Sequence, residues 1–176
     1  MENKKVFKIL IPILMICAIV SIGIIKKNPQ KVKEDNIITS DNEYPLNVVN
    51  VNLEELSKIG LPMIIDFGAN ECIPCKEMAP ALVEINEEMQ GKAIIKFVDV
   101  WKYPEASKGF PVQLIPTQII VEADGTPYVP SEEIAKTIRF RMYTDGESEE
   151  HAFTTHQGGL TKEQMRIILA DMGVEI

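Results

Sequence analysis

The apolar positions of this chain form one long segment near its start and a series of shorter segments after residue 44. Lys8 is the only charged residue between residues 6 and 25. An apolar segment of that length spans the hydrocarbon core of a bilayer as a helix. We therefore predict a signal anchor or transmembrane helix within residues 1–27. Residues 28–43 are polar, with no periodic apolar face, and are predicted to be a linker.

Two other interpretations of the N-terminal segment remain open. A cleaved signal peptide would have a shorter apolar core and small residues before the cut, which Ser21-Ile22-Gly23 match weakly. A lipoprotein would use Cys17, but Ile16 before it is larger than the small residue usual at such sites. Lysines flank the segment on both sides, and only a few residues precede it. This arrangement predicts a cytoplasmic N-terminus, with the rest of the chain outside the cytoplasmic membrane.

After residue 44 the pattern alternates between strand-like and helix-like segments. Near-continuous apolar runs, typical of strands covered on both faces, occupy residues 61–69, 93–100 and 117–121. Shorter strands are predicted at residues 45–51 and 151–155. Helical periodicity marks residues 53–58, 72–90 and 162–172, and residues 101–109 hold a short helix or loop. In the longest helix, the apolar stripe consists of Ala79, Leu82, Val83, Ile85 and Met89.

Residues 127–150 show a weaker pattern and are interpreted as an insertion. Residues 131–136 have room for one or two helical turns, and residues 138–143 alternate as a strand does. The order of the other elements predicts one α/β domain at residues 44–176. Its single sheet has a parallel part and an antiparallel part, with helices packed against it.

Charge argues against a nucleic-acid partner. The 176-residue chain has a formal net charge of −8. Five of its 18 basic residues and one of its 26 acidic residues precede residue 28, which leaves 13 basic against 25 acidic residues in the remainder. A surface with that balance repels phosphate backbones and anionic lipid headgroups.

The candidate chemistry lies in Cys72-Ile73-Pro74-Cys75, which contains two of the three cysteines. This spacing, after a strand and at the start of a helix, indicates a redox-active dithiol. A helix N-terminus favours an anion, so Cys72 is the candidate nucleophile. Cys75, one turn later, can then attack the mixed disulfide between Cys72 and the substrate and release the reduced substrate. Glu71 opposes this effect, because a neighbouring carboxylate disfavours a thiolate.

A cysteine pair at this spacing has two other common uses. A structural zinc site needs four ligands, and the chain offers no second cysteine pair beside His151 and His156. A purely structural disulfide would close too short a loop to contribute much stability. We therefore predict a redox-active pair that uses no metal and no cofactor.

Together with its neighbouring motifs, the cysteine pair resembles the thioredoxin family. The residues that carry the resemblance are Asp66-Phe67-Gly68-Ala69, Cys72 and Cys75 with Lys76, Ala79-Pro80, residues 96–99 and Ile115-Pro116-Thr117. The similarity runs over residues 63–121 and resumes at residues 158–169. It implies a three-layer sandwich with a central mixed sheet.

The resemblance also implies roles for individual residues. Cys72 would be the attacking thiol and Cys75 the resolving thiol, while Asp66 would be a buried carboxyl that moves a proton. Lys96 matches a lysine close to that carboxyl.

A second group of residues would meet the substrate. Pro116 matches a cis-proline facing the thiols, and the backbone of Ile115 beside it would pair with an extended substrate segment. Thr117, Ile73 and Pro74 would belong to the same substrate-binding surface.

The sequence also departs from the family pattern. Glu71 replaces the expected aromatic residue, Ile73-Pro74 replaces Gly-Pro, and residues 127–150 have no counterpart in short members. These features predict a membrane-tethered, extracytoplasmic oxidoreductase that reduces disulfides in a restricted set of proteins. Its electrons would come from a membrane thiol donor. The alternatives are an oxidant of secreted proteins and a binding module without turnover.

Overall fold

A computed structural model describes residues 43–176. The predicted signal anchor at residues 1–27 and nearly all of the predicted linker lie outside these residues. Within residues 43–176, no helix has both the length and the apolar character needed to cross a bilayer.

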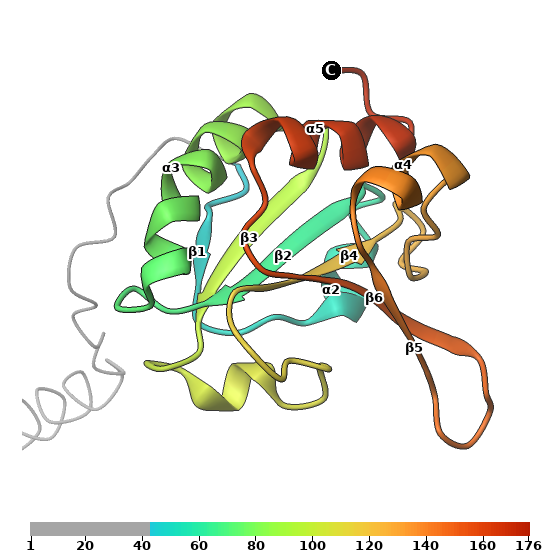
Figure 1. Ribbon diagram of the computed structural model, residues 1–176, viewed down its shortest axis with the longest axis horizontal. Helices are drawn as coiled ribbons and strands as arrows, with labels where there is room; N and C mark the ends of the chain where they lie inside the picture. Colours follow the sequence, from blue (N-terminus) through green and yellow to red (C-terminus); the bar gives the residue numbers. More distant parts are fainter. Residues whose placement is uncertain (1–42) are drawn as a thin grey trace, which may run out of the picture. The chain divides into compact units, whose positions relative to one another are not determined.

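The core of the fold is one six-stranded mixed sheet (Figure 1). Its spatial order is β1-β3-β2-β4-β6-β5. Strand β3 pairs in parallel with β1 and β2, whereas the β2–β4, β4–β6 and β6–β5 pairs are antiparallel. The strands are β1 (Asn47–Val48), β2 (Met63–Gly68), β3 (Ile94–Asp99), β4 (Thr117–Val121), β5 (Arg141–Thr144) and β6 (His151–Gln157).

Helices cover both faces of this sheet, which confirms the predicted α/β sandwich (Figure 1). The helices are α2 (Leu53–Ser57), α3 (Ile73–Glu88), the 3₁₀-helix η1 (Pro104–Ser107), α4 (Glu132–Thr137) and α5 (Lys162–Asp171). Side chains of α3, α4 and α5 pack on one face, and side chains of α2 and η1 pack on the other. The two buried clusters lie between these layers and the central strands.

Polar caps set several helix boundaries. The Asn52 side chain accepts a hydrogen bond from the Glu55 backbone N–H at the start of α2. Thr161 and Gln164 form a capping box at the start of α5, as the sequence predicts. Both devices satisfy backbone N–H groups that have no partner within the helix.

The buried stripe of α3 differs from the predicted one. Cys75, Met78, Leu82, Ile85 and Asn86 face the core, whereas Ala79 is exposed and Val83 is 46% exposed. The prediction selected apolar residues only. The face that begins at Cys75 follows the 3.6-residue period and includes a polar member, Asn86, whose amide donates to the Ile95 carbonyl.

The segment predicted as an insertion belongs to the sheet and the core. Strand β5 pairs with β6 at one edge of the sheet, and Tyr128 and Ile138 are buried in the same cluster as α3 and α5. The strand predicted from residue 138 begins at Arg141, because the Ile138 side chain enters the core at the end of α4.

Candidate active site

The two cysteines lie where β2 leads into α3. Helix α3 covers one face of the sheet (Figure 1). Cys72 is the N-cap residue of α3, and its side chain makes no capping hydrogen bond. Both thiols are free and largely buried, with Cys72 8% exposed and Cys75 4% exposed. At an N-cap the Cys72 sulfur is beside the first helical turn, where backbone N–H groups favour an anion.

Asp99, at the end of β3, orders the loop that precedes Cys72. One carboxylate oxygen accepts a hydrogen bond from the Asn70 backbone N–H at 3.2 Å. The other accepts from the backbone N–H groups of Trp101 and Lys102, at 3.1 and 3.0 Å. This carboxylate therefore ties the loop before the thiols to the loop after β3.

The bond between Ile115 and Pro116 is cis, as the family resemblance implied. The Cys72 thiol lies 3.9 Å from the Ile115 carbonyl oxygen. Behind the proline, Gly158 N–H donates to the Pro116 carbonyl at 2.9 Å, and the Thr117 hydroxyl donates to the Leu114 carbonyl at 2.7 Å. Thr117 is fully buried, so it supports the loop from within.

Asp66 is buried on β2, on the face of the sheet that carries the thiols. Gln118 Nε2 donates to its Oδ1 atom at 2.6 Å, while Oδ2 has no hydrogen-bond partner among the described residues. Burial raises the pKa of Asp66 to about 7, and the Gln118 hydrogen bond opposes that rise. Asp66 can therefore both take and give a proton near neutral pH.

Gly68 brings the carboxyl close to the resolving thiol. A Cβ atom at this position would lie 3.1 Å from Asp66 Oδ2 and 3.3 Å from Cys75 Sγ, and only 2.9 Å from a Phe97 ring carbon. The unpartnered oxygen and the thiol thus border the same small space. A residue larger than glycine would push these groups apart.

The thiol of Cys75 is strongly held in its protonated form. Burial raises its pKa to about 12, and a hydrogen bond with Cys72 acts in the same direction. At neutral pH such a thiol becomes a nucleophile only when a neighbouring group removes its proton. Asp66 is the carboxyl in position to do so.

The structure does not bring Lys96 to Asp66, which corrects that expectation. Phe97 is the register partner of Asp66, whereas Lys96 pairs with Ile65 and therefore projects to the opposite face. Its ammonium donates to the Pro45 carbonyl at 2.6 Å, and burial lowers its pKa to about 8. The predicted neighbour of Asp66 was Lys96, and the observed neighbour is Phe97, one position further along β3.

The sequence assigned no role to three residues of this site: Gln118, which it did not single out, and Asp99 and Gly68, which it included only within family motifs. A polar residue in the middle of an apolar run was the available signal for Gln118, because buried amides need partners. Asp99 ends a predicted strand, where a carboxylate can accept backbone hydrogen bonds. The closeness of Gly68 to Cys75 depends on how α3 packs against β2, which no local pattern reveals.

Three exposed apolar side chains lie on the segments that carry the thiols or adjoin their loops. Ile73 is 71% exposed, Leu114 beside the cis bond is 48% exposed, and Trp101 is 60% exposed. A groove of about 590 Å³ starts at Pro74 and runs between α3 and the start of α5. Among the described residues no group of three or more acidic, histidine or cysteine side chains could hold a metal ion.

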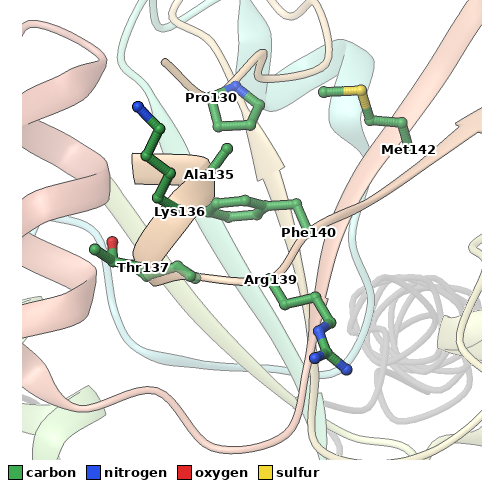
Figure 2. Close-up of a pocket in the computed structure, with 8 residues that line it drawn as sticks. Pro130, Ala135, Lys136, Thr137, Arg139, Phe140 and Met142 are labelled. Atoms are coloured by element: carbon green, nitrogen blue, oxygen red, sulfur yellow. The ribbon is translucent and has the colours of Figure 1, made fainter. Parts of the chain in front are cut away.

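A second hollow, of about 480 Å³, lies between α4 and the chain that leads into β5 (Figure 2). The Phe140 ring points toward α4, and Lys136, Arg139 and Met142 also line the hollow. It contains none of the residues predicted for the thiol site, so it is separate from the redox chemistry.

Comparison with known proteins identifies the class. The family model for thioredoxin matches residues 46–139. The chain is 35% identical over 99 residues to thioredoxin of Staphylococcus haemolyticus (strain JCSC1435), covering 53% of this chain and 93% of that protein. It is 40% identical over 60 residues to thioredoxin 1 of Chlorobaculum tepidum (strain ATCC 49652 / DSM 12025 / NBRC 103806 / TLS), covering 34% of this chain and 59% of that protein.

Among solved structures, a chloroplastic thioredoxin z superposes with a TM-score of 0.51 at 20% identity. That match covers 74% of this chain and 95% of the other, and it supports the fold. A buried cysteine pair on such a fold defines a thiol–disulfide oxidoreductase. The chain belongs to the thioredoxin family.

Proposed function

We propose that this enzyme reduces disulfide bonds in protein substrates, with Cys72 as the attacking thiol. The Cys72 thiolate attacks one sulfur of the substrate disulfide, forming a mixed disulfide and releasing the other sulfur as a thiolate. The backbone of Ile115, beside Pro116, would pair with the extended substrate segment. The exposed Ile73 and Pro74 would contact its side chains.

The second step uses Cys75. Asp66 Oδ2 accepts the Cys75 proton, and the resulting thiolate attacks Cys72 Sγ. The bond between Cys72 and the substrate sulfur breaks, and the substrate leaves as its second thiolate. Both electrons come from the dithiol, which ends as a disulfide while the substrate disulfide is fully reduced.

One observation carries this proposal: the two thiols lie between the cis-proline loop, which would bind the substrate, and the buried carboxyl of Asp66. Cys72 Sγ lies 3.9 Å from the carbonyl oxygen beside the cis-proline. The Cys75 thiol is hydrogen-bonded with Cys72, and it borders the space that Asp66 Oδ2 also borders. A structural disulfide or a binding module would need no unpartnered buried carboxylate oxygen behind the second thiol.

Single cysteine variants test the two roles. Cys72→Ser is expected to abolish reduction of a model protein disulfide and to form no mixed disulfide. Cys75→Ser should stop turnover after the first step and accumulate mixed disulfides, visible by mass spectrometry without reducing agent. If Cys75→Ser accumulates none while Cys72→Ser does, the two roles are reversed. If neither variant changes activity, the proposal fails.

The direction of electron flow rests on negative charge near the thiols. The exposed Glu71 adjoins Cys72, and the Asp66 carboxylate opposes ionisation of Cys75. Charges that disfavour thiolates favour the disulfide form and thus a reductant. Within the family range of about −270 to −120 mV, we expect a potential below roughly −200 mV.

Glu71→Gln is the matched test of this charge effect. The variant should have a less negative potential than the parent, by on the order of 10 mV, because a surface charge acts weakly. A parent potential near the oxidising end of the range would instead make the protein a disulfide-forming oxidant.

We also propose that the domain works outside the cytoplasmic membrane, tethered by its N-terminal segment and supplied with electrons by a membrane thiol donor. The support is the apolar pattern of residues 6–25 with its flanking lysines. Fractionation of cells expressing the full chain, followed by protease treatment of intact cells or spheroplasts, tests the location. A domain protected from protease and found in the cytosol would contradict it.

A further inference from the structure

We propose that Gln118 determines which oxygen of Asp66 exchanges a proton with Cys75. This inference rests on the proposed role of Asp66 and assigns a positioning residue to it. Gln118 is on β4, fully buried, and directly opposite Asp66 in the antiparallel β2–β4 register. Its amide bonds to Asp66, not to the cysteines.

The orientation of the Gln118 amide is set by two oxygen acceptors. Nε2 lies 2.6 Å from Asp66 Oδ1 and 3.1 Å from the Gly158 carbonyl oxygen, and it also lies 3.5 Å from the Met78 sulfur. An amide flipped by half a turn would place its own oxygen against the Gly158 carbonyl, where neither atom can donate. The nitrogen must therefore face both acceptors, and Gln118 Oε1 has no partner within residues 43–176.

This arrangement leaves one oxygen of Asp66 for the proton. Oδ1 already accepts the Gln118 N–H at 2.6 Å, and a hydroxyl oxygen is a weaker acceptor than a carboxyl carbonyl oxygen, so a proton on Oδ1 would weaken that hydrogen bond. Oδ2 is buried without a partner and borders the space beside Cys75 Sγ. The proton consequently binds to the oxygen next to the resolving thiol.

The same amide joins Asp66 to the substrate loop. Gly158, whose carbonyl accepts from Gln118, donates its own N–H to the Pro116 carbonyl at 2.9 Å. Gln118 thus also holds the carboxyl in a fixed position relative to the cis-proline.

Other titratable groups on the surrounding elements must be separated from Asp66 in any pH measurement. Lys96 is on the opposite face of the sheet. On the face of Asp66, the titratable groups at least partly buried beside the site include Cys72 and Cys75 on α3, Asp99 on β3 and His156 on β6, the register partner of Gln118. Tyr128 is buried in the same core cluster as α3 and α5. Burial lowers the pKa of His156, and its hydrogen bond to the Arg139 carbonyl opposes that shift.

The test compares Gln118→Met, which keeps the side-chain length but cannot donate, with the parent protein. Loss of a hydrogen bond to the carboxylate should raise the Asp66 pKa by roughly 1–2 units. The ¹³C NMR signal of the Asp66 side-chain carboxyl reports this pKa directly, and titration of His156 does not contribute to that signal. The pH midpoint of kcat/KM for disulfide reduction should rise in parallel, so activity lost at pH 6–7 returns at pH 9.

Thr154→Val is the matched control, because Thr154 is equally buried but pairs with Ile120, and its hydroxyl is hydrogen-bonded to the Tyr128 carbonyl and His151 Nε2, not to Asp66. Thr154→Val should lose stability with an unchanged pH midpoint of kcat/KM.

Asp66→Asn distinguishes failure of the Gln118 inference from failure of the proposed role of Asp66. If Asp66→Asn removes the pH dependence but Gln118→Met leaves the midpoint in place, the Gln118 inference is overturned and the role of Asp66 stands.

If Asp66→Asn itself leaves the pH profile unchanged, the proposed role of Asp66 fails, and the Gln118 inference fails with it.

A measurement on the unaltered protein covers the case in which Gln118→Met does not fold. The Gln118 Nε2 protons should stay protected from exchange on both sides of the Asp66 titration. Loss of that protection at low pH would place the proton on Oδ1 and overturn the inference.

Discussion

At the scale of single residues, the buried carboxyl of Asp66 opposes folding while it equips the site. A carboxylate removed from water is costly unless hydrogen bonds replace those of the solvent. Asp66 has one strong partner, Gln118, at Oδ1 and none at Oδ2 among the residues described. The incomplete compensation explains why its pKa rises to about 7 despite the opposing hydrogen bond.

This rise predicts how stability depends on pH. The folded protein keeps the Asp66 proton up to about pH 7, whereas the unfolded chain loses it near pH 3.9. The free energy of unfolding should therefore fall as pH rises between these values and stay lower above pH 7. Asp66→Asn, which cannot ionise, should remove this fall and be more stable than the parent at pH 8 by on the order of 4 kcal/mol.

Urea unfolding of the reduced proteins at pH 4 and pH 8, followed by circular dichroism, measures the effect. Asp145→Asn is the control, because Asp145 is exposed and backbone hydrogen bonds from Ser148 and Glu147 lower its pKa. It should gain no stability at pH 8. Equal pH slopes for Asp66→Asn and the parent would contradict the prediction.

At the scale of elements, α3 joins the redox site to the main core. Its N-terminus carries Cys72, and its buried face, from Cys75 through Leu82 and Ile85, packs between β2 and α5. The interior Pro80 is exposed, so its missing N–H is on the solvent side of the helix. The position of the thiols therefore depends on packing along this one face.

Substitutions at two adjacent positions of α3 test which face of the helix is buried. Leu82 is 2% exposed and Val83 is 46% exposed. Leu82→Ala should lower the free energy of unfolding by about 2–5 kcal/mol, because it leaves a cavity in the core. Val83→Ala should change it by no more than about 0.5 kcal/mol. Chemical denaturation of both variants provides the measurement, and similar losses at the two positions would contradict the face assigned here.

At the scale of the molecule, the α4–β5 segment is built into the domain. Tyr128 donates to the Asp171 carboxylate, which also accepts from the Ser131 backbone N–H at 3.0 Å. The end of α5 is thereby joined to the chain that enters α4. Figure 1 shows β5 and β6 as a hairpin that continues the sheet.

This connection predicts that residues 127–157 unfold together with the rest of the domain. Tyr128→Phe should lower stability by roughly 1–2 kcal/mol through loss of the hydrogen bond to a charged group. Native-state hydrogen exchange should give the same opening free energy for the β6 amides as for the β2 amides, and Tyr128→Phe should lower both by the same amount. Exchange from β6 at a much lower opening energy than β2 would instead show that the segment opens separately.

Local patterns were enough to predict most elements, because burial on a strand or helix imposes a period on the sequence. The three apolar runs became β2, β3 and β4, and the capping box marked the start of α5. The errors arose where one side chain's direction mattered. Lys96 lies one residue from the position that faces Asp66, and Val83 lies one residue from a position that faces the core. Motif position and apolar character alone did not distinguish these neighbours.

The sequence by itself determined the redox chemistry, since a Cys72–Cys75 pair at the junction of a buried strand and a helix fits few other uses. The order of its elements also predicted the mixed sheet, and its resemblance to the thioredoxin family implied the cis bond before Pro116 and the buried Asp66. Only the tertiary structure decided that Phe97 and not Lys96 lies beside Asp66, and that Gln118 holds its carboxyl. Those contacts join strands far apart in the chain, and their register depends on how the whole sheet packs, which no single segment encodes.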